Sequence, residues 1–237
     1  VIQAVMFIFR SLGLKCVPFL PQIVPAFLHV MGSCEHGLRE ALFQQMGVLV
    51  SIVRQHIRSF LPDIFKLVDT CWDGNLEQIL VLVQEVAIVL RDEIKNYLPA
   101  TIPRLLSSLS WAHVSRGGQR AGGLGPARGG SADRVGLSPQ NSAGPTRHGA
   151  MAKVMQTLEV LGGNLSDYRY LVVPALVRLI ESAEVPLDVR CLGLYSLGRL
   201  CKTLAFGDYA SRIIHPIMRV LDGKWVGRGP GEGDGAG

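Results

Sequence analysis

Histidines and cysteines are the side chains of this sequence best suited to holding a metal or acting as nucleophiles. A zinc site needs ligands at short, regular spacings, such as a CxxC pair or two histidines four residues apart on a helix. The histidines show no such spacing, and no CxxC pair occurs. The sequence therefore predicts no metal site. The histidines are His29, His36, His56, His113, His148 and His215.

The five cysteines are irregularly spaced, and their number is odd. This pattern favours buried thiols in a reducing compartment over a disulfide framework. The thiols expected to be buried are Cys16, Cys34, Cys71, Cys191 and Cys201.

Sequence motifs of common enzymes are missing. The sequence contains no GxxxxGK[ST] or GxGxxG phosphate-binding loop, no HRD or DFG string of a protein kinase, and no GxSxG elbow of a hydrolase. We therefore predict no catalytic and no cofactor-binding residue in this chain.

Several polar residues precede apolar runs and have a simpler structural role than catalysis. Glu35, Asp167 and Asp208 are expected at or before helix starts, where a carboxylate complements the helix dipole. His215 precedes Pro216, and we expect it to pack or cap at a helix start.

The basic charge is concentrated in one unusual stretch. The chain carries a net charge of +5, and residues Ser115–Gly149 hold five arginines against one aspartate. The rest is close to neutral, which argues against a nucleic-acid partner. The most apolar segment, Ile79–Leu90, contains Gln84 and Glu85 and is shorter than the ~20 residues of a membrane span, so we expect no membrane insertion.

A recurring phrase divides the chain into repeats. The phrase has an aromatic residue or Leu, often a Pro, and then apolar residues around a second Pro, as in Phe19–Leu28 and Tyr97–Leu106. The second-Pro positions are separated by 41, 37, 71 and 42 residues. Two helices with their connections need ~40–47 residues in HEAT-type repeats. The positions used are Pro25, Lys66, Pro103, Pro174 and Pro216.

Each phrase is expected to begin the second helix of a pair, because Pro at the first helical position loses no hydrogen bond. Apolar stripes with helical spacing precede the phrases and predict the first helices. The stripes include Ile2, Val5, Phe9 and Leu12; Leu38, Leu42, Met46, Leu49 and Val53; Leu76, Leu80, Val83, Ala87, Leu90 and Ile94; Met151, Val154, Leu158, Leu161 and Leu165; and Leu194, Leu197, Cys201 and Leu204.

These patterns predict an all-α fold, a HEAT-type α-solenoid of about five helical hairpins with a disordered insertion. Residues 1–109 hold about three hairpins, and residues 150–222 hold about two. Residues 110–149 and 223–237 are rich in Gly and poor in large apolar side chains, so burial cannot offset their ordering entropy. We expect both to be disordered. One hypothesis is that both segments are translated intron, because Val114-Ser115 and Gly223-Lys224-Trp225 can be encoded with splice-donor strings. The alternative is a regulatory loop or an RGG-like RNA-binding tether.

Specific strings resemble one family. Val5–Cys16, Leu42–Gly47 and above all Asp208–Ile217 closely resemble the HEAT-repeat region of the target-of-rapamycin kinases, which are phosphatidylinositol-kinase-related serine/threonine kinases. The resemblance covers about residues 1–109 and 151–222, and it fails in the Gly/Arg-rich stretch and in the tail. The chain starts at Val1 in mid-pattern and is interpreted as a fragment of something longer.

The resemblance implies a scaffold segment of a large kinase in nutrient and growth signalling. It implies protein partners of the raptor or rictor type, self-association of the full-length protein, and a cytoplasmic location with further pools at lysosomal and other endomembranes and in the nucleus. The family's catalytic residues lie outside this segment, so none is assigned here. The alternative interpretation is a HEAT-repeat adaptor of another class, a transport receptor or a phosphatase scaffold.

Overall fold

The structure is a computed structural model that describes residues 2–109 and 147–221. These residues form five helical hairpins and contain no strand, which confirms the predicted all-α solenoid. The hairpins are α1 (Ile2–Leu12) with α2 (Leu20–Ser33), α3 (His36–Val53) with α4 (Leu61–Cys71), α5 (Leu76–Val89) with α6 (Leu98–Ser108), α8 (Arg147–Leu161) with α9 (Arg169–Glu181), and α10 (Leu187–Leu200) with α11 (Ala210–Leu221).

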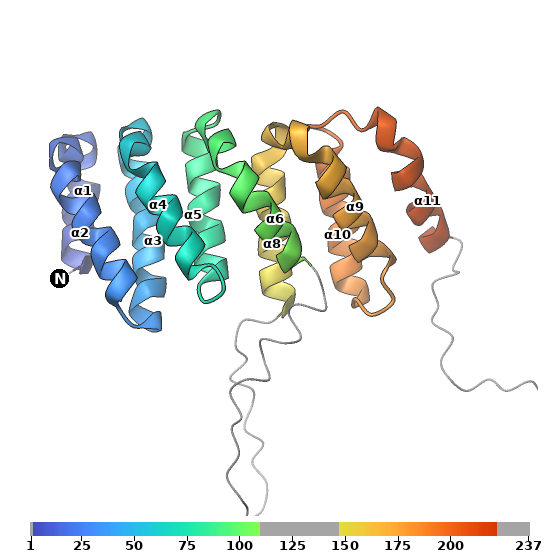
Figure 1. Ribbon diagram of the computed structural model, residues 1–237, viewed down its shortest axis with the longest axis horizontal. Helices are drawn as coiled ribbons and strands as arrows, with labels where there is room; N and C mark the ends of the chain where they lie inside the picture. Colours follow the sequence, from blue (N-terminus) through green and yellow to red (C-terminus); the bar gives the residue numbers. More distant parts are fainter. Residues whose placement is uncertain (1, 110–146, 222–237) are drawn as a thin grey trace, which may run out of the picture.

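The hairpins stand side by side along the long axis of the molecule (Figure 1). The first helices stack in the order α1, α3, α5, α8 and α10, and we call them the first layer. The second helices, α2, α4, α6, α9 and α11, form the second layer. Because α5 packs directly on α8, the array continues past residues 110–146.

Short 3-10 turns join the two helices of each hairpin. They span Gly13–Phe19, Arg54–Phe60, Glu93–Asn96, Gly162–Tyr168 and Gly207–Tyr209. Three second helices carry Pro in their first turn, as predicted, at Pro21, Pro62 and Pro99. The second-Pro residues Pro25, Pro103, Pro174 and Pro216 lie inside α2, α6, α9 and α11, as expected, whereas α9 and α11 have no Pro in their first turn.

One boundary of the predicted insertion is wrong. Helix α8 begins at Arg147, so Arg147, His148 and Gly149 are helical and belong to the fourth hairpin. The interrupted position lies between the third and fourth hairpins. The remainder of the predicted insertion and the predicted tail lie outside the described residues.

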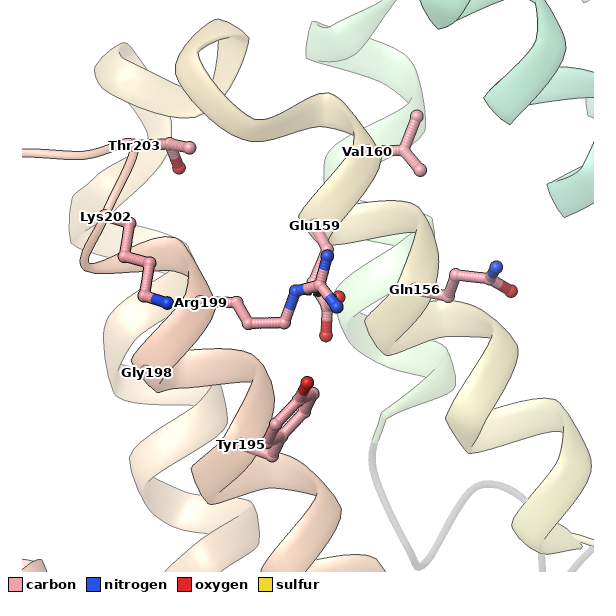
Figure 2. A pocket seen from close by; sticks show the side chains of 8 residues that line it. All are labelled: Gln156, Glu159, Val160, Tyr195, Gly198, Arg199, Lys202 and Thr203. Atoms are coloured by element: carbon pink, nitrogen blue, oxygen red, sulfur yellow. Dashed lines mark ion pairs between the residues drawn. The ribbon is translucent and has the colours of Figure 1, made fainter.

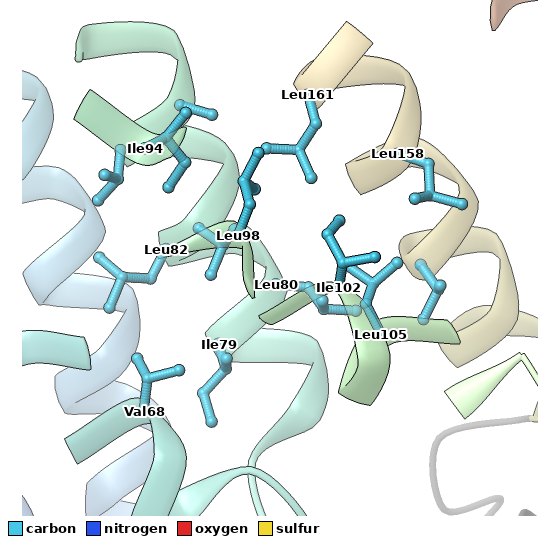
Figure 3. Close-up of a cluster of buried hydrophobic side chains, with 14 of the residues drawn as sticks. Val68, Ile79, Leu80, Leu82, Ile94, Leu98, Ile102, Leu105, Leu158 and Leu161 are labelled. Carbon is cyan, nitrogen blue, oxygen red and sulfur yellow. The ribbon is translucent and has the colours of Figure 1, made fainter. Parts of the chain in front are cut away.

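Apolar side chains form one continuous core between the layers. Figure 3 shows its middle, where Leu80 of α5, Ile102 of α6 and Leu158 of α8 lie close to one another. All three side chains are fully buried. At about 25 cal/mol per Å2 of buried apolar surface, this packing is the main force that holds successive hairpins together.

The ends of the predicted stripes depart from the expected burial. Leu12 and Leu38 are 38% and 46% exposed, and Cys201 is also exposed. These residues lie at the ends of first-layer helices or beyond them. At these places the apolar spacing of the sequence does not predict that a side chain is buried against a neighbouring hairpin.

One segment, Gln3–Ser33, is long and apolar enough to cross a membrane by length and composition alone. It is folded as the hairpin of α1 and α2, with Gly13 at φ +55° starting the turn between them. Helices of 11 and 14 residues reach roughly 16 and 21 Å at 1.5 Å per residue, short of the ~30 Å hydrocarbon core. In this folded form the segment is therefore too short to span a bilayer.

Candidate interaction surface

A surface groove lies in the first layer, between α8 and α10 (Figure 2). Its volume is about 810 Å3. Helix α8 provides Gln156, Glu159 and Val160, and α10 with the residues after it provides Tyr195, Gly198, Arg199, Lys202 and Thr203.

Glu159 organises the centre of this groove. Ser196 donates a hydrogen bond from Oγ to Glu159 Oε1 at 2.5 Å, and Arg199 Nε lies 3.0 Å from Glu159 Oε2. The carboxylate side chain is 15% exposed, whereas Arg199 is 55% exposed. Both carboxylate oxygens are therefore occupied by α10, which fixes the position of this helix against α8 and leaves Arg199 accessible at the surface.

Tyr195 stands beside this ion pair. Its ring is one helical turn from Arg199, and the guanidinium carbon lies 5.8 Å from the ring centroid. The tyrosine is 62% exposed although it is large and partly apolar. Exposed Tyr and Arg side chains held in one place are the residue types that contribute most to protein interfaces.

The sequence pattern did not single out Tyr195, Arg199 or Glu159 as a partner contact. The sequence feature that could have indicated them is that Tyr195 and Arg199 lie four residues apart in a predicted helix, outside its apolar stripe. Glu159 is 36 positions before Tyr195 in the printed sequence, so only stacking of the repeats brings it to them.

The structure does not gather the residues weighed earlier for metal binding. Within residues 2–109 and 147–221, no group of three or more His, Cys, Asp or Glu side chains could hold a metal ion. His36 makes a 2.6 Å hydrogen bond through Nε2 with the carbonyl of Gly74, and His148 lies 3.4 Å from a carboxylate oxygen of Asp188. The first contact holds the loop between α4 and α5 against α3, and the second joins the fourth and fifth hairpins.

Glu35 is the residue before α3, as expected, and its side chain makes no capping hydrogen bond. The expectation for His215 needs correction. His215 is an exposed residue in the interior of α11, which begins at Ala210, so it does not lie at a helix start. Asp167 and Asp208 lie within the 3-10 turns that precede α9 and α11.

The cysteines divide by burial. Cys16 and Cys71 are buried and Cys34 is partly buried, but Cys191 and Cys201 are exposed, which corrects the expectation for these two. Burial raises the pKa of the Cys16 and Cys71 thiols. A raised pKa lowers the fraction of nucleophilic thiolate at neutral pH, so these two positions fit packing better than catalysis.

Comparison with known proteins gives consistent matches. The family model for the serine/threonine-protein kinase mTOR domain matches residues 1–54. Serine/threonine-protein kinase mTor of Drosophila melanogaster is 36% identical over 94% of this chain, and serine/threonine-protein kinase tor1 of Schizosaccharomyces pombe is 34% identical over 93%. Serine/threonine-protein kinase TOR of Arabidopsis thaliana is 30% identical over 94%.

The matches cover most of this chain but only a small part of each relative. Each match covers more than nine-tenths of this chain, so it includes residues both before and after the segment 110–146. The chain spans only 8% of the length of each of these relatives. The similarity therefore concerns one segment of a much longer protein.

Proposed function

This chain belongs, as one segment, to the target-of-rapamycin family of serine/threonine-protein kinases, and from this premise we propose that it is a helical-repeat scaffold that binds partner subunits in nutrient and growth signalling. The observation that carries the proposal is the placement of Tyr195 and Arg199 in the groove between α8 and α10. The core is filled by apolar side chains, whereas this groove offers accessible aromatic and charged groups on a rigid support.

The partners that we propose are subunits of the raptor or rictor type, with self-association of the full-length protein as a further contact. We place the scaffold in the cytoplasm, with access to lysosomal and other endomembrane surfaces and to the nucleus. Any kinase activity of the whole protein would come from regions outside this segment. No observation on the described residues favours a transport receptor or a phosphatase scaffold.

The test is co-purification of the full chain with a purified raptor-type or rictor-type subunit, followed by cross-linking. Tyr195→Ala should weaken binding about tenfold or more, because truncating an interface hot spot costs ~2 kcal/mol. Tyr170→Ala is a matched control, since Tyr170 is 59% exposed but lies on α9 in the second layer.

Three outcomes decide the proposal. Failure of the unaltered chain to bind either type of subunit contradicts the scaffold function. Equal binding by the two tyrosine variants contradicts the assignment of the groove. ATP turnover by this chain would contradict the placement of catalysis elsewhere.

A further inference from the structure

A second groove lies in the other layer, between α9 and α11. Its volume is about 440 Å3. The floor contains Val173, Pro174, Val177 and Pro216, of which Val173 and Pro216 are buried. An apolar floor of this size can accept an aliphatic side chain from a partner.

The rim of this groove carries an excess of positive charge. The charge comes from Arg178 and Arg212, which line it and are exposed. The one carboxylate in the lining, Glu181, has an oxygen 3.6 Å from a guanidinium nitrogen of Arg219, so its charge is already balanced. Arg178 donates from Nε to the carbonyl of Pro174 at 3.2 Å, which holds this cation at the groove.

The two prolines leave backbone acceptors in the helices that flank the groove. Pro has no N–H, so Pro174 in α9 and Pro216 in α11 each leave the carbonyl four residues earlier without its usual helical donor. These carbonyls belong to Tyr170 and Arg212. A partner segment in extended conformation could donate backbone N–H groups to such acceptors.

We propose that the groove between α9 and α11 docks an acidic segment of a partner protein, with one aliphatic side chain on the proline and valine floor and flanking carboxylates against Arg178 and Arg212. This inference rests on the proposed scaffold function and names the chemistry of one contact. The combination of an apolar floor with an uncompensated cationic rim is what selects an acidic partner over a basic or uncharged one.

The test uses the full chain and a fluorescein-labelled peptide in which a Leu-Leu pair is flanked by two glutamates on each side. The matched peptide has glutamines in place of the glutamates. We expect fluorescence polarisation at low salt to show binding of the acidic peptide and at least about fivefold weaker binding of the glutamine peptide. At 0.5 M salt, binding of the acidic peptide should weaken, whereas binding of the glutamine peptide should change little.

Charge reversals then locate the site. Arg178→Glu and Arg212→Glu should each weaken binding of the acidic peptide about tenfold, because attraction at a partly screened rim becomes repulsion. Lys66→Glu should change it less than about twofold. Lys66 is an exposed cation of α4 at the repeat position where α9 and α11 have Pro174 and Pro216, and it lines none of the grooves described here. Circular dichroism of each variant checks that the helices are retained.

Four results would overturn the inference. They are no saturable binding of the acidic peptide up to 1 mM, equal binding of the glutamine peptide, unchanged binding by both arginine variants, or a loss of self-association in these variants that identifies a second copy as the occupant. The subunit co-purification that depends on Tyr195 can succeed in any of these cases, so the two proposals fail separately.

Discussion

At the scale of single residues, one buried polar contact joins the third and fourth hairpins, which are separated in the sequence by residues 110–146. Gln84 of α5 donates from Nε2 to Thr157 Oγ1 of α8 at 2.8 Å, and the threonine hydroxyl donates to the carbonyl of Lys153. Both side chains are buried. We predict that Thr157→Val lowers the free energy of unfolding by about 1–3 kcal/mol, because the Gln84 amide remains buried without its acceptor. Urea unfolding of the full chain measures it.

The control for this substitution is Thr70→Val. Thr70 is exposed in α4 and makes the same kind of hydroxyl bond to a carbonyl four residues earlier, so its replacement should cost less than about 0.5 kcal/mol. Adding Gln84→Leu to Thr157→Val should recover part of the loss, because both polar groups are then removed. Equal stability of the two threonine variants would contradict the importance of the buried bond.

Contacts of this kind could not be predicted from the sequence. In the sequence, Gln84 is only an interruption of an apolar segment. Gln84 and Thr157 are 73 positions apart, and only the stacking of the repeats brings them together. The same reason explains Glu159 with Ser196. Helical periodicity predicts which face of a helix is apolar, but it does not predict which residue of the neighbouring hairpin each side chain contacts.

At the scale of elements, three hairpins turn at equivalent positions. Gly13, Arg54 and Gly162 each begin the turn after a first-layer helix, and their φ angles are +55°, +53° and +44°. Each precedes the second-Pro position of its own repeat by the same number of residues. We predict that Arg54→Gly raises the free energy of unfolding by about 1 kcal/mol, because Gly adopts positive φ without the steric cost of a Cβ. Thermal and urea unfolding measure the change.

The reverse substitution supplies the control. Gly13→Ala should lower stability by about 1 kcal/mol, and a Cβ there would meet no atom within 4 Å, so the effect comes from the backbone alone. If Arg54→Gly destabilised the chain, contacts of the arginine side chain would outweigh its backbone strain. The repeat period could be read from the sequence, but Arg54 gave no sign of a left-handed turn because a glycine does not mark it.

At the scale of the whole molecule, each hairpin packs mainly on its neighbours, and stability should follow position in the array. We predict that amide hydrogen exchange is slowest in α5 and α8, which have neighbours on both sides, and fastest in α1 and α11, which end the described array. Leu158→Ala, at a fully buried position of α8, should cost about 2–5 kcal/mol and accelerate exchange most in α8 and its first-layer neighbours α5 and α10.

Hydrogen exchange followed by mass spectrometry tests this gradient, with Ile214→Ala as the control, because Ile214 is 56% exposed in α11 and its loss should leave the middle hairpins unchanged. Acceleration of every helix by the same factor in Leu158→Ala would mean that the five hairpins unfold as one unit. A response that becomes smaller toward α1 would mean that each hairpin is stabilised mainly by its immediate neighbours. Under that second outcome, a partner bound between α8 and α10 stabilises those helices directly and the distant hairpins progressively less.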